Sequence, residues 1–192
     1  MTIFAFLDVE TTGLDPVDNY VLEVAWQFTD DRFNPIGEGQ SWIVDHGLRE
    51  PTVAAQIRDS AFITNMHSES GLLLDLANPS VPKLRMDDIL DAFVDSALDV
   101  GAANDQVRLA GYSVSFDREF LRENGWRDLF ESKALGFQMH HRILDLSSVI
   151  QMFEAADREV PSTYNENPHR ALDDALDALE KAQLMAREIS WS

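Results

Sequence analysis

The chain has 192 residues, a net charge of −19 and no cysteine, which excludes disulfides and any metal site built from thiolates. Hydrophobic residues make up 45% of it and charged residues 26%, as in ordinary globular proteins, so a disordered chain is also excluded. No apolar stretch is long enough to span a membrane and no signal-type segment opens the chain, so we expect a single cytoplasmic domain over residues 1–192.

The first 45 residues contain three segments with strand character. Residues 3–7 form a continuous apolar run, which is typical of a strand buried on both faces. Residues 21–29 and 37–45 have strand patterns too, and a turn at Asn34-Pro35 separates them. This arrangement predicts an antiparallel meander of three strands.

The rest of the chain alternates helical and strand patterns. Residues 46–85 are polar and carry three prolines, which predicts loops and short helices. The later elements that we expect are helices over residues 86–98, 116–124, 147–156 and 170–189, and strands over residues 107–111 and 142–146. Three strands followed by alternating helices and strands predict an α/β domain with a mixed sheet flanked by helices.

Acidic residues stand at the boundaries of several of these elements. Asp8 and Glu10 stand at the end of the first strand, directly after its apolar run, and Asp117 lies near the start of a predicted helix. Asp174 lies one turn into the last helix, and His169 precedes that helix in a loop. Because residues i and i+2 share one face of a strand, Asp8 and Glu10 repel each other unless a cation lies between them. Carboxylates favour hard cations such as Mg²⁺ or Mn²⁺.

Each of these residues, taken alone, also has an ordinary structural interpretation. Asp8 and Glu10 could belong to a solvated turn, and Asp117 could cap a helix. Asp174 could be one of several solvated acids of the last helix, and His169 could be a surface residue. The interpretation as a metal site therefore depends on all of them occurring together, in this order.

Three segments, which begin at Asp8, Ser113 and His169, resemble in this order the signature of the DEDD exonucleases. In the subtype that the chain resembles, the last motif carries a histidine five residues before its aspartate. Counting from His169, this aspartate is Asp174 and not Asp173. The resemblance implies a ribonuclease H-like fold and removal of nucleotides from a 3′ end with two Mg²⁺ or Mn²⁺ ions. The residues implied to bind the ions are Asp8, Glu10, Asp117 and Asp174. His169 is the implied general base, since histidine titrates near neutral pH.

Further segments resemble one branch of these exonucleases, the oligoribonucleases, which are homodimers that degrade RNAs of two to a few nucleotides. His67 begins a His-x-x-Ser-Gly-Leu segment of that branch. Phe62 stands where the family has a base-stacking tryptophan, and Leu14 stands where the family wedges a leucine between bases. The residues that the resemblance implies in substrate binding are Thr11, Gly13, Leu14, Phe62, His67, Ser113, His141, Arg142 and Ser147.

Ser113, Arg142 and Ser147 match the residues with which oligoribonucleases cap the 5′ phosphate of a dinucleotide. The chain also departs from the family near this cap. His141 replaces a tyrosine that reaches across the dimer, and Tyr112 replaces an asparagine. The resemblance therefore implies a homodimer, with the contribution of the second subunit altered in this chain.

The strongly acidic composition bears on the choice of substrate. A protein that binds many phosphates is usually basic, so a charge of −19 favours a short strand with few phosphate contacts. Bound metal ions would then supply the local positive charge. The implied partner is a short single strand with a free 3′ end, of RNA or, as the alternative, of DNA. A proofreading or repair-type DNA exonuclease of the same subtype is the alternative enzyme. A catalytically inactive nucleic-acid-binding module is disfavoured, because all five catalytic positions are present.

Overall fold

The computed structural model of the chain describes residues 2–132 and 136–190. A six-stranded mixed sheet with the order β4-β3-β2-β1-β5-β6 forms its centre. The strands are β1 (Ile3–Thr11), β2 (Val21–Thr29), β3 (Gln40–Val44), β4 (Lys83–Leu84), β5 (Val107–Gly111) and β6 (Leu144–Asp145). The first three strands form the antiparallel meander that the sequence predicts. The other three each run parallel to the strand beside which they lie.

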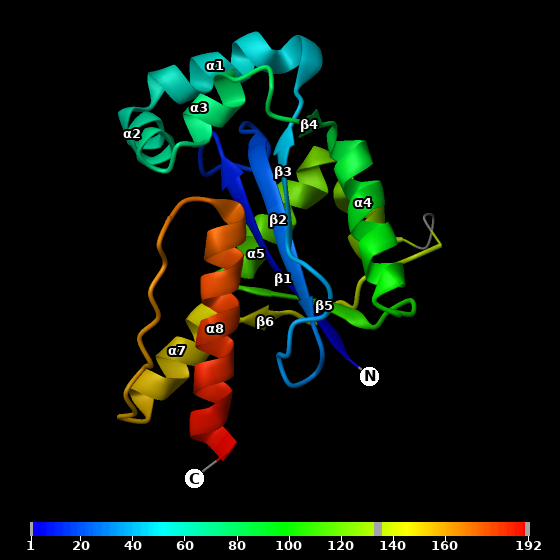
Figure 1. The fold of residues 1–192 in the computed structure, drawn as a ribbon, viewed down its shortest axis with the longest axis vertical. Helices are drawn as coiled ribbons and strands as arrows, with labels where there is room; N and C mark the ends of the chain where they lie inside the picture. Colours follow the sequence, from blue (N-terminus) through cyan, green and yellow to red (C-terminus); the bar gives the residue numbers. More distant parts are fainter. Residues whose placement is uncertain (1, 133–135, 191–192) are drawn as a thin grey trace.

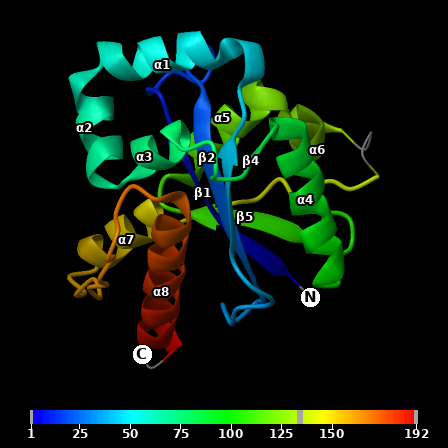
Figure 2. The same cartoon turned by 45° about the horizontal axis from the view of Figure 1, so that its top comes forward.

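Helices cover both faces of the sheet and one of its ends (Figure 1). They are η1 (Gly47–Arg49), α1 (Glu50–Asp59), α2 (Ala61–Glu69), α3 (Leu72–Ala77), α4 (Met86–Asp99), α5 (Val114–Leu121), η2 (Arg122–Trp126), α6 (Arg127–Glu131), α7 (Leu146–Ala155) and α8 (Ala171–Ser190). In both views α7 and α8 lie on one side of the sheet and α4 on the other, while α1, α2 and α3 close the end at which β1 finishes (Figures 1 and 2). Within the described ranges, no helix has the length and apolar content needed to cross a membrane.

The side chains of β1 point to two different faces of the sheet, one apolar along its whole length and one that carries acidic residues. One row packs into the main core together with α4 and α5; its members are Ile3, Ala5, Leu7 and Val9. The opposite row begins with Phe6, which packs against α8, and continues with Asp8 and Glu10. Because side chains alternate along a strand, β1 carries its two carboxylates on the α8 face, beyond the apolar contact.

Helix α8 lies close to the sheet because the side chains on its inner face are small. Its buried residues include Ala171, Ala175, Ala178 and Ala182. Small side chains let the helix axis approach the strands, so the first turn of α8, with Asp174, comes next to the carboxylates of β1.

Several boundaries differ from those expected from the sequence. β1 extends past its apolar run to Thr11, because β2 pairs with it from Phe4 to Thr11, and the two acids lie toward the end of the strand as expected. The helix expected over residues 116–124 begins at Val114 and ends at Leu121, before a turn in which Gly125 has a φ of 115°. The strand expected over residues 142–146 is shorter, and β4 was not predicted at all.

Candidate active site

Four carboxylates converge where β1, α5 and α8 meet. Asp8 and Glu10 come from β1, Asp117 from α5 and Asp174 from α8, and all four line a cavity of about 210 Å³ together with His169. Ligand atoms of Glu10, His169 and Asp174 lie within 4.8 Å of one another, close enough to share one metal ion. The structure thus brings together the five residues that the sequence proposes as catalytic.

Asp117 is buried and does not cap a helix. Its carboxylate accepts a hydrogen bond of 2.9 Å from the backbone N–H of Val9. Strand β5 pairs with β1 only as far as Phe6, so Asp117 takes the place of a strand partner at Val9. Gly111 lets the end of β5 lie close to the backbone of β1, because a Cβ atom at that residue would meet the carbonyl oxygen of Leu7 at 2.8 Å.

The loop before α8 holds Asp174 from both sides. One carboxylate oxygen accepts a hydrogen bond of 3.1 Å from the backbone N–H of His169, and the other accepts one of 2.5 Å from Asn165. His169 has a φ of 66° and Ser113 a φ of 47°, values that L-residues seldom adopt. Such conformations persist where the surroundings enforce them and often mark functional sites.

Burial and mutual repulsion hold protons on this cluster. Burial, followed by repulsion from Asp117 and Glu10, raises the pKa of Asp8 well above its usual value. Burial and then repulsion from Asp174 raise the pKa of Glu10 to about 8, and burial raises that of Asp117 to about 7. Burial also raises the pKa of Asp174. Burial is the largest cause for all four carboxylates, and repulsion within the cluster adds to it.

This donor set fits divalent cations. Carboxylate oxygens and one imidazole are hard to borderline ligands, and a cation between them would remove the repulsion that raises their pKa values. In the described part of the chain, Asp8 has no hydrogen-bond donor to its carboxylate, and His67 lies 3.6 Å from a carboxylate oxygen of Glu10. Oxygen atoms of the cluster therefore remain free to bind ions.

Glu23 is a buried acid beside the site that the sequence analysis did not identify. It lies directly opposite Glu10 in the β1–β2 pair. Arg170 donates hydrogen bonds of 3.0 and 3.2 Å to it, and the backbone N–H of Ala171 donates a third of 3.1 Å. Arg170 also forms an ion pair of 2.9 Å with Asp75 on α3. Glu23 thereby fixes the start of α8 against β2. The signal available in the sequence was that Glu23 is the single charged residue of this strand.

Tyr112 is a second residue beside the carboxylates whose contact the sequence analysis did not predict. It lines the same cavity, and its hydroxyl donates a hydrogen bond of 2.8 Å to Asp177, which lies one turn after Asp174 on α8. Burial, followed by this hydrogen bond, raises the pKa of the Tyr112 hydroxyl. Tyr112 thus joins the end of β5 to α8 next to the carboxylates.

The residues predicted to contact bases lie at the cavity mouth, with one exception. Leu14 is 78% exposed and Phe62 is 70% exposed, although both line the cavity beside the carboxylates. Gly13 packs closely against the side chain of Asn19, where a Cβ atom would come within 2.4 Å of its amide oxygen. His67 is fully buried, and its Nε2 lies 2.9 Å from the carbonyl oxygen of Thr11, so it supports Glu10 and Thr11 from behind.

The predicted cap residues are only partly assembled. Ser113 and Ser147 lie together, with 3.1 Å between their hydroxyl oxygens. His141 and Arg142 are exposed, and the ring of His141 stacks on that of His140 at a centroid distance of 4.4 Å. Neither His141 nor Arg142 lines the cavity that holds the carboxylates.

Comparison with known proteins places the chain in a family. No family model matches it. It is 32% identical to an oligoribonuclease of Corynebacterium glutamicum, over 95% of this chain and 77% of that protein. It is 34% identical to an oligoribonuclease of Streptomyces griseus, over 91% of this chain and 80% of that protein.

A solved structure is similar in fold. The zinc-bound complex of E. coli exonuclease I with single-stranded DNA superimposes with a TM-score of 0.61 at 20% identity. The match covers 98% of this chain but only 41% of that one, so the chain spans less than half of exonuclease I. The ribonuclease H-like fold predicted from the motifs is thereby confirmed. From its identity with the curated relatives over most of its length, the chain belongs to the oligoribonuclease family of exonucleases.

Proposed function

We propose that this chain is a metal-dependent 3′→5′ exonuclease that hydrolyses short single-stranded oligoribonucleotides to nucleoside 5′-monophosphates. The observation that carries the proposal is the convergence of four carboxylates and His169 in one cavity, with Leu14 and Phe62 exposed at its mouth. Membership of the oligoribonuclease family supports it, and so does the similar fold of exonuclease I, which has been solved with zinc and single-stranded DNA.

The roles of the residues follow from their positions. Asp8, Glu10, Asp117 and Asp174 would hold two Mg²⁺ or Mn²⁺ ions, and the chemistry that such ions supply is activation of a water molecule and stabilisation of the leaving 3′ oxygen. His169 would accept the proton of the attacking water at an imidazole nitrogen. The hydrogen bonds from Val9 to Asp117 and from Asn165 to Asp174 keep two of the carboxylates in fixed orientations.

Leu14 and Phe62 suit the bases of a short strand. They come from two different segments that line the site, Leu14 from the β1–β2 connection and Phe62 from α2. Stacking on exposed apolar and aromatic side chains needs no positive charge and tolerates any base. Binding of this kind agrees with a chain that carries 34 acidic and 15 basic residues.

Ser113, Ser147 and Arg142 are the proposed determinants of substrate length. Two hydroxyls and a guanidinium can bind a terminal phosphate by charge-assisted hydrogen bonds. An internal phosphodiester has less charge and continues into a further nucleotide. The proposal needs Arg142 to turn toward the paired hydroxyls of Ser113 and Ser147 when a 5′ phosphate is bound.

A comparison of substrate lengths tests the proposal. We expect kcat/KM for a 5′-phosphorylated diribonucleotide to exceed that for a twenty-mer, and Arg142→Ala to raise KM for the dinucleotide far more than for the longer strand. Arg58→Ala, which removes an exposed arginine of α1, is the control for the lost charge. Equal kcat/KM values for the two lengths in the wild type would overturn the length selection, and a preference for DNA would favour the repair-type alternative.

We further propose that the chain is a homodimer, as the oligoribonuclease resemblance implies. The exposed ring of His141, which stacks on half-buried His140, stands where the family reaches across its subunit interface. Light scattering coupled to size exclusion should give twice the mass of the 21.7 kDa chain. A monomer that still degrades dinucleotides would remove the second subunit from the proposal.

A further inference from the structure

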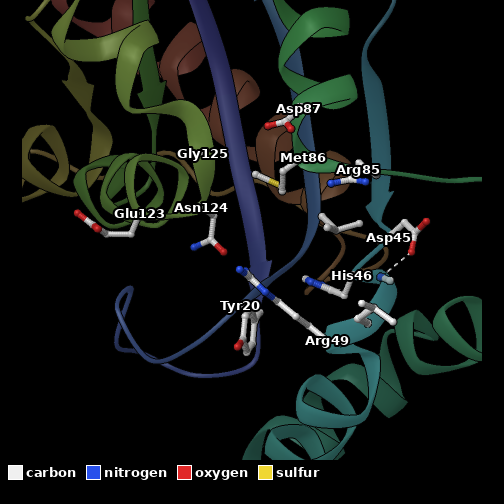
Figure 3. Close-up of a pocket in the computed structure, with 13 residues that line it drawn as sticks. Tyr20, Asp45, His46, Arg49, Arg85, Met86, Asp87, Glu123, Asn124 and Gly125 are labelled. Carbon is white, nitrogen blue, oxygen red and sulfur yellow. Dashed lines mark hydrogen bonds between the residues drawn. The ribbon is translucent and has the colours of Figure 1, made fainter.

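A second cavity, larger than the candidate active site, opens on the α4 side of the molecule. It has a volume of about 550 Å³ and lies between the end of β3, η1, the start of α4 and the turn after α5 (Figure 3). It shares no lining residue with the cavity that holds the carboxylates. Its volume is in the range of pockets that bind small organic molecules.

Two arginines face this cavity without a carboxylate partner. Arg49 comes from η1 and Arg85 directly precedes α4, and neither forms an ion pair with any residue in the described ranges. Unpaired guanidiniums in one cavity are unexpected in a chain with 34 acidic residues, where carboxylate partners are plentiful. They leave positive charge available to an anion from outside.

The acids in the cavity wall do not satisfy these arginines. Asp45 accepts a hydrogen bond of 2.9 Å from the backbone N–H of Gly47, which Figure 3 shows as a dashed line. Glu123 is paired with Arg122 at 3.1 Å and with Arg127 at 2.8 Å. Asp87 lies in the first turn of α4, where the positive end of the helix compensates it.

Tyr20 and His46 give the cavity an aromatic side. The guanidinium carbon of Arg49 lies 5.9 Å from the centre of the Tyr20 ring, and the His46 ring meets Tyr20 edge-on at 5.6 Å. In Figure 3 the side chain of Arg49 extends across the hollow beside Tyr20 and His46. The Nε2 atom of His46 is buried and has no hydrogen-bond partner among the described residues. Tyr20, and not this enclosed nitrogen, is therefore the aromatic group that a ligand in the cavity can contact.

We propose that this cavity binds a nucleotide, with its phosphate on Arg49 and Arg85 and its base against Tyr20. Guanidiniums match the geometry of phosphate oxygens, and an aromatic face accepts a base. The cavity lies across the β1–β2 connection from the active site, because Tyr20 pairs with Thr12 through two hydrogen bonds of 2.9 Å while Thr11 and Leu14 line the other cavity. The nucleotide is either free or the far end of a strand.

Calorimetric titration in excess chelator tests this binding apart from catalysis, because no hydrolysis is needed. The probes are adenosine 5′-monophosphate, inorganic phosphate and a 5′-phosphorylated pentaribonucleotide. We expect Arg49→Ala and Arg85→Ala each to weaken nucleotide binding by about tenfold, the value of one charge-assisted hydrogen bond. Tyr20→Leu should weaken binding of the mononucleotide but leave the affinity for inorganic phosphate unchanged.

Arg32→Ala is the matched control, since it removes an exposed arginine from the β2–β3 connection at the other end of the sheet. It should leave all three affinities unchanged. If Arg49→Ala and Arg85→Ala lower the affinity for the pentanucleotide alone, the cavity binds the end of a strand. If they also lower the affinity for the mononucleotide, it binds a free nucleotide. Binding of neither nucleotide to the wild type, or equal affinities in Arg49→Ala, Arg85→Ala and Arg32→Ala, would overturn the proposal. Failure of exonuclease activity would not affect it.

Discussion

Glu10 and Glu23 face each other across two strands, and their surroundings give them different roles. Glu23 is neutralised by Arg170 and by the start of α8. Glu10 has His67 at 3.6 Å, and the pKa of this histidine is lowered by burial, so it offers little charge. Glu10 is therefore the carboxylate available to a cation, whereas Glu23 anchors the start of α8 to β2.

Asp173 and Asp174 are adjacent acids that differ in orientation. Asp174 lines the cavity and accepts hydrogen bonds from His169 and Asn165, whereas Asp173 does not line it. We expect Asp174→Asn to lower kcat by at least about a hundredfold through loss of a metal ligand, and Asp173→Asn to leave it nearly unchanged. Steady-state hydrolysis of a dinucleotide measures both, and similar losses in the two variants would contradict the assignment.

His169 is held beside the carboxylates by a strained backbone, with its φ at 66°. We expect His169→Ala to slow the chemical step by roughly 10²–10⁴-fold, the usual contribution of a general base. Single-turnover kinetics isolates that step. Binding of Mn²⁺, followed by calorimetry, should persist in the variant, because the four carboxylates remain. A variant with an unchanged rate would remove His169 from the mechanism.

At the scale of elements, the motifs identified residues that the fold brings to one cavity, but not the contacts that position them. The apolar run over residues 3–7 predicted β1 with Asp8 and Glu10 at its end, and the pairing with β2 shows that the strand continues to Thr11. From the sequence Asp117 could be interpreted as a helix cap, because its true partner, Val9, lies 108 positions away and no local pattern reveals it. The role of Glu23 depends on Arg170, 147 positions away. Local patterns carry no information about such distant contacts, whereas helix periodicity predicted α4 and α8 well.

The junction of β2 and α8 should be a stability determinant. Glu23→Gln leaves Arg170 without its buried partner, so we expect the free energy of unfolding to fall by roughly 1–3 kcal/mol. Glu119→Gln is the control, because its ion pair with Arg122 is exposed and should contribute less than about 1 kcal/mol. Urea denaturation measures both variants. Equal effects would show that Glu23 does not anchor α8.

At the scale of the whole molecule, the acidic cluster should make the metal-free protein sensitive to alkaline pH. The folded state raises the pKa of Glu10 to about 8 and that of Asp117 to about 7, so it binds protons more tightly than the unfolded chain. Raised pKa values stabilise the fold at low pH, and this contribution is lost as the pH rises toward 8. We expect the melting temperature in chelator to fall between pH 5 and pH 8.5.

Two comparisons check this behaviour by thermal denaturation. Glu10→Gln should flatten the pH dependence, because the amide cannot ionise. Mg²⁺ or Mn²⁺ at pH 8 should raise the melting temperature of the wild type, since ions bind only the assembled carboxylates. An identical pH dependence in wild type and Glu10→Gln would mean that other groups control the stability.

Hydrolysis of a labelled diribonucleotide tests the central claim most directly, namely that the carboxylate cluster of β1, α5 and α8 is a metal-dependent exonuclease site. The wild type is incubated with Mg²⁺, with Mn²⁺ and with excess chelator, beside Asp174→Asn. We predict that nucleoside 5′-monophosphate appears with at least one of the metals, and that it appears neither in chelator nor with the variant. Full hydrolysis in excess chelator, or no hydrolysis with either metal, would contradict the claim.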